Sequence, residues 1–416
     1  MRGSACKEMN SASEAVVVGS GPVGAFAAWN LAKLGVNVTV FEEHAEAGIP
    51  SHCAGHLSIL GLKKLGLEVL PKGVVENNYS GANFYSAKGT KFSVRLRKPV
   101  TCAVNRALFD KFLADRAEKA GARFSLNSRV KSLVLKNGFV VGVNVDRHSA
   151  MEMQSETKVV VDCEGISSRL VRQAGLAILD HHELVHGVEA EVEGVDNVVS
   201  DEVEVYLDNE YARGLYGWLM PRPDGTAKVG LAAKRGNPRE LFQKFVSKHP
   251  VASKQLSKAK VRRMAFHPIS LGGPICRTYA NGFLAVGDAA SQVKPTTGGG
   301  VVFGLTCARI AAEVVAEALR RNEASSDFLQ LYQERCNSSL GFDFKTMLRA
   351  RKFINSLSNE KINNAIQFCC KFRLDNALKD IEEIDFQGQT LIKILTKPAV
   401  FAGLAYFLLL YLTANP

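Results

Sequence analysis

A glycine-rich turn close to the start of the chain has the residue types and spacing that bind a pyrophosphate. Gly19, Gly21 and Gly24 form the pattern G-x-G-x-x-G, and Val23 lies within the same turn. The first glycine permits a tight turn, the second lets backbone N–H groups approach a pyrophosphate, and the third lets a helix pack against a strand. Glu42, about 20 residues downstream, can accept hydrogen bonds from ribose hydroxyls. These five residues are therefore candidates to bind a dinucleotide.

The elements that must position this turn lie on either side of it. Residues 15–18 are a β-branched run typical of a strand buried on both faces. Residues 25–34 are an apolar helical stretch that ends before Gly35, and residues 38–41 are a second strand that ends at Glu42. The helix N-terminus adds partial positive charge beside the pyrophosphate. Because the acid disfavours a 2′-phosphate, the pattern predicts FAD or NAD rather than NADP.

Two later segments resemble flavoproteins of the hydroxybenzoate-hydroxylase fold. Residues 159–172 resemble the A-D-G-x-x-S-x-x-R segment of those proteins, with Glu164 where aspartate is usual, and residues 283–290 match their G-D-A-A motif. In that family the aspartate at the position of Asp288 binds the ribityl chain of FAD. The resemblance therefore favours FAD over NAD and implies an α/β fold with a Rossmann-type FAD-binding domain.

The same resemblance implies further contacts with FAD. Arg106, which precedes a predicted helix over residues 107–119, matches an arginine that lies near the cofactor, and the backbone at Val130 is expected to pass the adenine. A glycine-rich loop ends at Gly300, and a helix is predicted to begin near Val301. Backbone N–H groups at that helix N-terminus can stabilise negative charge on the pyrimidine end of reduced flavin.

A closer resemblance is to the geranylgeranyl reductases, including the archaeal digeranylgeranylglycerophospholipid reductases. Residues 48–56 are similar to a cysteine-containing loop that lies against the flavin in that family. The resemblance implies that Cys53, Ala54 and Gly55 contact FAD and that Cys53 takes part in catalysis. Cys53 could tune the flavin, donate a proton or fill space, since a lone buried cysteine is often just a small hydrophobe.

Residues 216–221 resemble the Y-x-W-x-F-P substrate motif of the same family. Met220 replaces the phenylalanine, and Arg213 stands where a proline is expected. The resemblance implies that Tyr216 and Trp218 take part in catalysis on the substrate.

Two histidines are candidates for proton delivery, and a phenylalanine is a candidate for the wall of a substrate tunnel. His52 and His56 flank the loop cysteine and have a suitable intrinsic pKa for delivering a proton, while surface histidines are the plainer interpretation. Phe303 could wall a prenyl tunnel with the aromatic residues of the substrate motif, while core packing is the plainer interpretation.

The resemblance implies hydrogenation of C=C bonds in the geranylgeranyl (isoprenoid) chains of membrane lipids or their precursors, with hydride from N5 of reduced FAD. An FAD-dependent monooxygenase and a quinone-coupled dehydrogenase share the FAD motifs and are the alternatives, together with a flavin or lipid carrier that has no turnover. No C-x-x-C spacing supports the iron–sulfur module common in the quinone-coupled enzymes. No second G-x-G-x-x-G follows residue 34, so the external electron donor stays open among NAD(P)H, a deazaflavin and a ferredoxin.

Turn-punctuated strand patterns interrupt the nucleotide-binding pattern twice. The FAD-binding domain is predicted in three parts, at residues 14–72, 101–178 and 276–322. An inserted antiparallel β-sheet substrate domain is predicted at residues 73–100 and 179–275. A C-terminal helical cap with an apolar tail is predicted at residues 323–416.

Composition limits the partners. A net charge of +11 over 416 residues favours an anionic neighbour, and the absence of helix-turn-helix, zinc-finger or basic-zipper signatures disfavours nucleic acid. Residues 1–14 lack the apolar core of a signal peptide, and the apolar run at residues 399–412 is shorter than the roughly 20 residues of a spanning helix. We therefore expect a cytoplasmic enzyme that binds an anionic membrane surface peripherally. The basic cluster at residues 349–352 could meet phosphate headgroups.

Nine cysteines are scattered along the chain without any C-x-x-C pair, which disfavours a zinc site or an iron–sulfur cluster. No metal ligand is predicted. Cys307 and Cys336 resemble a cysteine pair of some geranylgeranyl reductases, and two reduced core thiols are the state expected in a reducing compartment.

Overall fold

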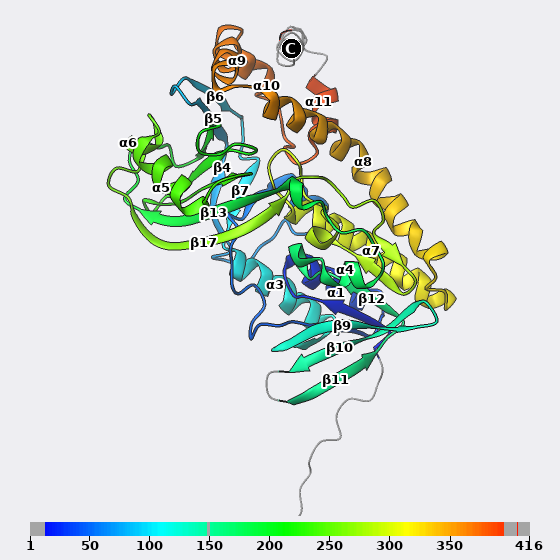
Figure 1. The fold of residues 1–416 in the computed structure, drawn as a ribbon. Helices are drawn as coiled ribbons and strands as arrows, with labels where there is room; N and C mark the ends of the chain where they lie inside the picture. Colours follow the sequence, from blue (N-terminus) through cyan, green and yellow to red (C-terminus); the bar gives the residue numbers. More distant parts are fainter. Residues whose placement is uncertain (1–12, 148–149, 395–405, 407–416) are drawn as a thin grey trace, which may run out of the picture.

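A six-stranded sheet lies at the centre of the larger layered part of the molecule (Figure 1). The computed structural model describes residues 13–147, 150–394 and Tyr406. The strand order is β18-β19-β12-β1-β2-β8, and β1 (Ala15–Val18) pairs in parallel with β2 (Val38–Phe41) and β12 (Val159–Asp162). All three strands are buried along their length, which explains their β-branched runs. Both strands predicted beside the glycine turn are confirmed.

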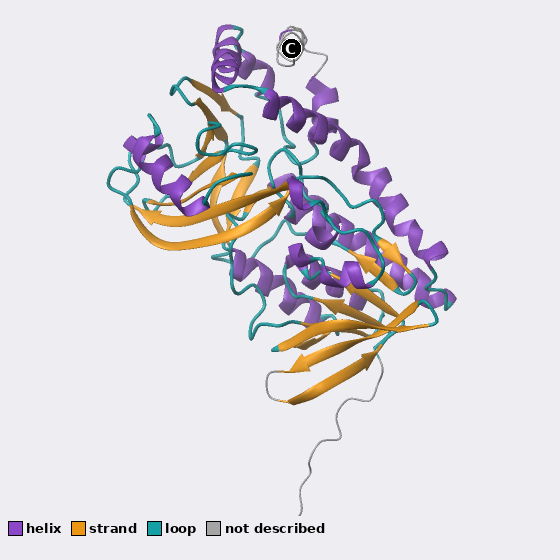
Figure 2. Cartoon of the chain, in the orientation of Figure 1, coloured by secondary structure: helices purple, strands orange, loops and turns teal. Residues whose placement is uncertain are grey.

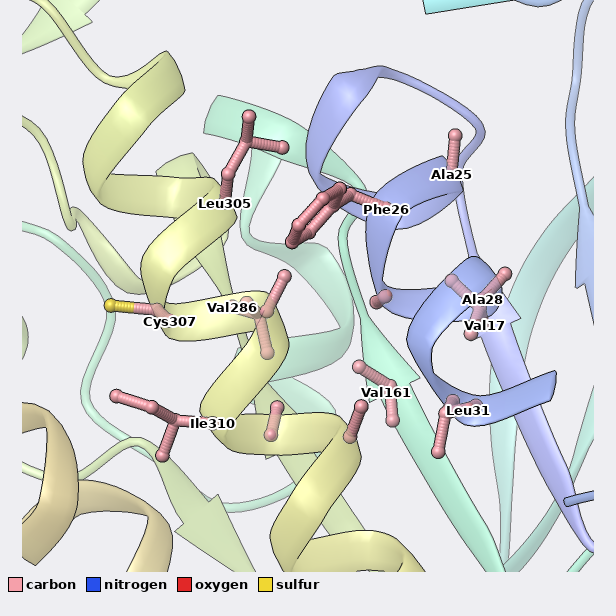
Figure 3. Close-up of a cluster of buried hydrophobic side chains, with 14 of the residues drawn as sticks. Val17, Ala25, Phe26, Ala28, Leu31, Val161, Val286, Leu305, Cys307 and Ile310 are labelled. Atoms are coloured by element: carbon pink, nitrogen blue, oxygen red, sulfur yellow. The ribbon is translucent and has the colours of Figure 1, made fainter. Parts of the chain in front are cut away.

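Helices cover one face of this sheet. They are α1 (Pro22–Lys33), α3 (Arg106–Lys119) and α7 (Val301–Arg321). Figure 3 shows part of the core between them, with Phe26 of α1 beside Leu305 of α7, in one cluster of buried apolar residues. The helix predicted over residues 25–34 begins at Pro22 instead, because proline is readily accepted in the first turn of a helix.

A three-stranded antiparallel sheet covers the opposite face, with the order β11-β10-β9 (Figure 1). Its strands are β9 (Ser128–Lys136), β10 (Phe139–Arg147) and β11 (Ala150–Glu156). Val130 and Val143 of this layer share a buried apolar cluster with Val16 and Val160 of the central sheet. The sequence patterns did not predict this layer.

A seven-stranded sheet forms a second layered region, with the order β17-β13-β16-β15-β14-β5-β6. Its strands are β5 (Gly81–Ser86), β6 (Lys91–Arg95), β13 (Leu184–Glu193), β14 (Glu202–Leu207), β15 (Gly217–Pro221), β16 (Thr226–Ala233) and β17 (Lys260–Ser270). Every neighbouring pair is antiparallel except β5 with β14, which come from the two separate insertions. The predicted inserted sheet is therefore confirmed, with one parallel pair in it.

Short elements connect these layers. The small sheet β3-β7-β4 lies between the two regions, and the remaining strands complete the central sheet. The short elements are β3 (His56–Ser58), β4 (Val75–Tyr79), β7 (Thr101–Val104), β8 (Arg123–Ser125), β18 (Tyr279–Ala280), β19 (Phe283–Ala285), α2 (Ile59–Lys64), α4 (Arg169–Gln173), α5 (Pro238–Lys248) and α6 (Ala252–Gln255).

The C-terminal part is helical, as predicted. Helix α8 (Ser326–Ser356) runs from α7 to the far end of the seven-stranded sheet, where α9 (Asn359–Lys371) packs on β5 and β6 (Figures 1 and 2). Two shorter helices follow, α10 (Leu374–Leu378) and α11 (Gln387–Ile394). The apolar tail at residues 399–412 lies, apart from Tyr406, outside the described residues. None of the helices that the structure describes is both long and apolar enough to cross a bilayer.

Candidate functional site

One cavity of about 1220 Å³ connects the glycine turn with the helical cap. Its walls come from the central sheet, the loop at residues 48–55, the seven-stranded sheet and the cap helices. Every residue predicted to bind the cofactor or to act on the substrate lines it: Gly19, Gly21, Val23, Gly24, Glu42, Cys53, Ala54, Gly55, Arg106, Val130, Tyr216, Trp218, Asp288, Gly300 and Val301. The fold thus brings together residues that are far apart in the sequence, while their individual roles stay predictions.

The glycine turn has the geometry that each glycine requires. Gly19 has a φ of +89°, in the left-handed region that favours glycine. A Cβ on Gly24 would lie 2.0 Å from the carbonyl oxygen of Gly19, so no side chain fits where α1 approaches the turn. Apart from its chain neighbours, a Cβ on Gly21 would meet no atom of the described residues within 4 Å, because Gly21 faces the cavity. That open face beside the start of α1 fits a pyrophosphate.

Glu42 is buried at the carboxyl end of β2, across from the turn. Its Oε2 accepts hydrogen bonds from the backbone N and the Oγ of Ser20, at 2.7 and 3.0 Å, and its Oε1 accepts one from the backbone N of His44, at 2.9 Å. These contacts hold the carboxylate at the cavity wall, where a ribose is predicted.

Asp288 and the N-terminus of α7 form the next part of the wall. Asp288 follows β19, and burial raises the pKa of its carboxyl, an effect that Arg106 partly offsets. A Cβ on Gly300, the residue before α7, would lie 2.8 Å from Oδ1 of Asp288, so the helix N-terminus can come close only as glycine. The carboxyl of Asp288 and the N-terminus of α7 therefore lie side by side at the cavity wall, where a flavin with its ribityl chain is predicted.

The loop at residues 48–55 is fixed by charged groups on both sides. Arg106 forms two hydrogen bonds of 3.0 Å with Asp110, and Cys53 lies beside its guanidinium. Arg263 of β17 donates to the backbone oxygen of Ser51. The backbone N of Gly55 donates to Sγ of Cys53 at 3.4 Å. These contacts hold Cys53 at the cavity wall.

Lys228 is a buried residue of this site that was not predicted. It lies on β16 and donates to the backbone oxygens of Ala54 and Val104, both at 3.0 Å, while its Nζ lies 2.7 Å from Oε2 of Glu76. The signal was present in the sequence, as one lysine within the otherwise apolar run of residues 227–233, all of it buried.

The histidines beside Cys53 have exposed surface and line the cavity, with protein packed around them. His52 stacks on His267 of β17 with ring centroids 4.1 Å apart, and burial lowers the pKa of both to about 4. His56 bonds to Oγ1 of Thr101 at 2.8 Å, and burial, with help from Lys294, lowers its pKa to about 4. All three imidazoles are therefore neutral at pH 7, which favours a hydrogen-bonding role over storage of a proton.

The substrate motif crosses the same wall. Tyr216 donates from its hydroxyl to the backbone oxygen of Thr297 at 3.1 Å, and burial raises its pKa to about 12. Its ring packs edge-on against Trp218, with centroids 6.1 Å apart. The indole of Trp218 lies over Gly230 of β16, where a Cβ would be 2.3 Å from its Cζ2. Tyr216 therefore ties the seven-stranded sheet to the glycine-rich loop before α7.

Beyond Trp218 the cavity becomes an apolar channel between the sheet and the cap. One wall comes from the neighbouring strands β15, β14, β5 and β6. Trp218 pairs with Val205, Val205 with Phe84, and Phe84 with Phe92, so these side chains form one row across the strands. The other wall was not predicted and consists of Ala350, Phe353, Ile354, Leu357, Ile362, Ala365, Ile366, Cys369, Leu378, Ile381 and Ile384. A long hydrocarbon chain fits this lining.

The structure places two further residues that the sequence singled out, Phe303 in the core, as its plainer interpretation had it, and Arg351 away from the surface. Phe303 does not wall the cavity; it is fully buried and packs on Phe344 and Phe386, with ring centroids 5.1 and 5.6 Å away, because its face of α7 points to the cap. Arg351 does not belong to an exposed basic cluster; it is buried and pairs with Glu183.

The paired cysteines are confirmed as buried free thiols. Cys307 and Cys336 lie in the core between α7 and α8, and burial, followed by the neighbouring thiol of Cys336, raises the pKa of Cys307.

The molecule is an FAD-dependent oxidoreductase, as defined by its Rossmann-type sheet, its glycine turn, Asp288 and the N-terminus of α7. A family model described as an FAD binding domain matches residues 12–340. The chain is 35% identical over 356 residues to digeranylgeranylglycerophospholipid reductase 2 of Methanopyrus kandleri, which covers 84% of this chain and 88% of that one. It is 32% identical over 360 residues to digeranylgeranylglycerophospholipid reductase of Methanocaldococcus jannaschii, covering 86% and 90%. The chain belongs to the digeranylgeranylglycerophospholipid reductase family.

Solved structures agree with this fold. A geranylgeranyl bacteriochlorophyll reductase-like protein from Thermoplasma acidophilum superimposes with a TM-score of 0.84 at 25% identity, over 94% of this chain and 98% of that one. The flavin-dependent brominase Bmp2 superimposes with a TM-score of 0.70 at 18% identity, over 88% and 92%, which shows the shared fold alone.

Proposed function

We propose that this enzyme hydrogenates C=C bonds in the geranylgeranyl chains of membrane lipids or their precursors. The observation that supports this proposal is the continuity of the cavity, which joins a site for FAD to an apolar channel along the seven-stranded sheet. The names of the related reductases support the same substrate class. A monooxygenase or a quinone-coupled dehydrogenase would need the same cofactor site, and the two related enzymes named above are reductases.

The chain's residues divide this work between them. Reduced FAD supplies the hydride when it is bound. An isolated alkene is poorly electrophilic, so alignment and exclusion of water must contribute much of the catalysis. The apolar channel binds the chain and excludes water, while Trp218 and Tyr216 sit where the channel meets the cofactor site.

The direct test uses the FAD-loaded protein reduced anaerobically with dithionite and mixed with a digeranylgeranylglycerol phospholipid. Flavin reoxidation together with a gain of about 2 Da for each reduced bond is the expected result. Flavin that stays reduced until air is admitted would contradict the proposal. Air oxidation with formation of a hydroxylated lipid would favour the monooxygenase instead.

A substitution in the apolar channel tests whether the lipid chain binds there. Ala365 of α9 is buried and lines the channel, so Ala365→Trp should block the far end and prevent long chains from entering. Asn364 is the exposed neighbour on the same helix, and Asn364→Trp is the matched control. Loss of geranylgeranyl reduction in the first variant only would support the assigned channel.

We further propose that Cys53 takes part in the chemistry. Cys53→Ala should lower turnover by about 100-fold, the usual cost of losing a proton-transfer group, with unchanged FAD content. The control is Cys102→Ala, because Cys102 is buried on β7 and does not line the cavity. Turnover equal to that of the wild type would leave Cys53 with a space-filling role.

We also propose peripheral binding to an anionic membrane through the cap. Arg349 and Lys352 are exposed on α8, and exposed apolar side chains lie in the same cap at Ile354 and Phe372. Each basic residue near an anionic surface contributes about 1 kcal/mol. Vesicles with phosphatidylglycerol should therefore carry the wild-type protein upward in flotation, and R349E/K352E should reduce that recovery. Equal recovery with uncharged vesicles would contradict this surface.

The electron donor is proposed to be external. No second glycine-rich dinucleotide motif follows residue 34, so NAD(P)H, a reduced deazaflavin or a ferredoxin would have to approach the bound flavin itself. Stopped-flow reduction of the FAD-loaded protein by each of the three identifies the donor.

A further inference from the structure

Reduction of an alkene, on which this inference rests, needs a proton as well as a hydride. The proton must come from a group of the protein that holds one at neutral pH and can be refilled from solvent. Among the ionisable residues of the cavity, Glu189 has the position, the access to solvent and the protonation that this role requires. It lies in the middle of β13 and was not singled out by any sequence motif.

Glu189 lies in the same cross-strand row as Trp218. Glu189 pairs with Gly230 of β16 on one side and with Ala265 of β17 on the other, and Gly230 in turn pairs with Trp218. The intervening residue has no side chain, and the indole of Trp218 covers it. Glu189 and Trp218 therefore face the cavity as neighbours, at the junction of the cofactor site and the apolar channel.

A second, smaller cavity of about 230 Å³ meets the large one at this point. We call it the side pocket; it is lined by Ser51, Cys53, Glu76, Asn105, Arg106, Ala107, Glu189, Glu191, Lys228, Arg263 and Ala265. Five of these residues also line the large cavity, namely Ser51, Cys53, Arg106, Glu189 and Ala265. Arg263 is exposed and the Glu191 side chain is 36% exposed, so the side pocket has a polar wall that solvent reaches. Glu189 thus contacts both spaces.

The carboxyl of Glu189 is enclosed, and its Oε2 has no hydrogen-bond partner within the part of the chain that the structure describes. The charged groups around it are Lys228 of β16, Arg106 of α3, Arg222 after β15, Glu191 of β13, Arg263 of β17 and Glu76 of β4. The two nearest cations are engaged elsewhere, Lys228 with Glu76 and Arg106 with Asp110. Burial outweighs the cations and raises the pKa of Glu189 to about 7.

Most other ionisable groups of the large cavity do not meet the requirement, and Asp288, whose pKa burial also raises, does not line the side pocket. His52, His56 and His267 have pKa values lowered to about 4, so they carry no spare proton at neutral pH. Tyr216 holds its proton against the backbone of Thr297, with a pKa raised to about 12. Asp110 and Asp385 are ion-paired with Arg106 and Lys294.

We propose that the Glu189 carboxylic acid is the proton reservoir for alkene reduction and that it is refilled from solvent through the side pocket. In each cycle the alkene π bond breaks and two C–H bonds form, one with the hydride and one with the proton that leaves Glu189. The carboxylate left behind then takes a proton from solvent through the side pocket. The external donor supplies two electrons and solvent supplies a second proton, which together replace the hydride.

The test compares wild type with Glu189→Gln in single turnovers of the dithionite-reduced, FAD-loaded protein with a digeranylgeranylglycerol phospholipid. In the wild type the rate should fall as pH rises through about 7, because the reservoir loses its proton above its pKa. E189Q should react about 100-fold more slowly, with no inflection near that pH and with unchanged FAD content and KM. E189D, which keeps the acid, should retain the inflection.

A readout that needs no turnover comes from infrared spectroscopy of the oxidised, FAD-loaded protein. The C=O band of a protonated carboxylic acid should disappear as pH rises through about 7 in the wild type and should be absent in E189Q. The control is Glu204→Gln, because Glu204 is a buried carboxyl of β14 that hydrogen-bonds Asn83 and lines neither cavity. E204Q should keep the wild-type pH profile.

The outcomes separate the two proposals. Normal lipid reduction by E189Q with the wild-type pH profile, or a wild-type protein without a carboxyl band that titrates near pH 7, would overturn the reservoir alone. Failure of the wild-type protein to reduce the lipid would overturn the proposed function and the reservoir with it.

Discussion

Replacing Gly21 by alanine is expected to yield a folded protein that no longer retains FAD. Apart from its chain neighbours, a Cβ at this position meets no atom of the described residues within 4 Å, so the folded chain accepts it without strain. The same Cβ projects into the cavity beside the N-terminus of α1, where the pyrophosphate must approach the backbone. FAD affinity should fall about 100-fold, equivalent to about 2.7 kcal/mol. Flavin fluorescence during titration of the apoprotein measures this loss.

Gly24→Ala separates the effect on the fold from the effect on the cofactor. Its Cβ would lie 2.0 Å from the carbonyl oxygen of Gly19 and 3.2 Å from Cβ of Cys163, so α1 would have to move away from β1. This variant should lose thermal stability even without FAD, whereas apo Gly21→Ala should unfold at the wild-type temperature.

Gly341→Ala is the matched control for both glycine variants. Gly341 is a helical glycine of α8, distant from the turn in sequence, and its added Cβ would make an ordinary contact of 3.7 Å. It should bind FAD normally and gain up to about 1 kcal/mol of stability. Normal FAD binding by Gly21→Ala would contradict the assigned pyrophosphate position.

Local sequence patterns predicted the parts of the site that a short segment builds by itself. The turn at Gly19 to Gly24 and the strands beside it depend on neighbouring residues, so spacing alone identifies them. Asp288, which lies three positions after a buried strand, was instead implied by the resemblance to flavoproteins. Family resemblance then supplied the loop that carries Cys53 and the strand that carries Trp218.

Residues whose role depends on distant segments could not be predicted in this way. Lys228 holds the backbone of Ala54, which is 174 positions away, and nothing close to either residue in sequence indicates the contact. Glu189 becomes distinctive only because strand register places it beside Gly230 and Trp218. The two alternatives for Phe303, core packing and a tunnel wall, stayed open for the same reason, since helical periodicity indicates a buried face without identifying what covers it.

The ion pair between Lys294 and Asp385 is the second site where a single change should have a large effect. Lys294 lies before the glycine-rich loop, Asp385 lies before α11, and their side chains are only 9% and 3% exposed. Both residues line the large cavity, so the pair ties the C-terminal segment to the loop that precedes α7. Leaving one buried charge without its partner typically costs about 3–5 kcal/mol. Asp385→Asn should therefore destabilise the protein by about that amount, as measured by urea unfolding of the FAD-loaded enzyme.

A nearby pair in the same segment supplies the control. Lys64 lies 3.2 Å from Glu383, but its side chain is 47% exposed and Glu383 keeps a hydrogen bond from Oγ of Ser58, so Lys64→Met should cost at most about 1 kcal/mol. The double variant K294M/D385L removes both buried charges and should recover much of the stability that Asp385→Asn loses, because no uncompensated charge remains. Its flavin should nevertheless dissociate faster if the pair holds the cap against the glycine-rich loop. If the double variant recovers stability and its flavin dissociates at the wild-type rate, the pair has only a structural role.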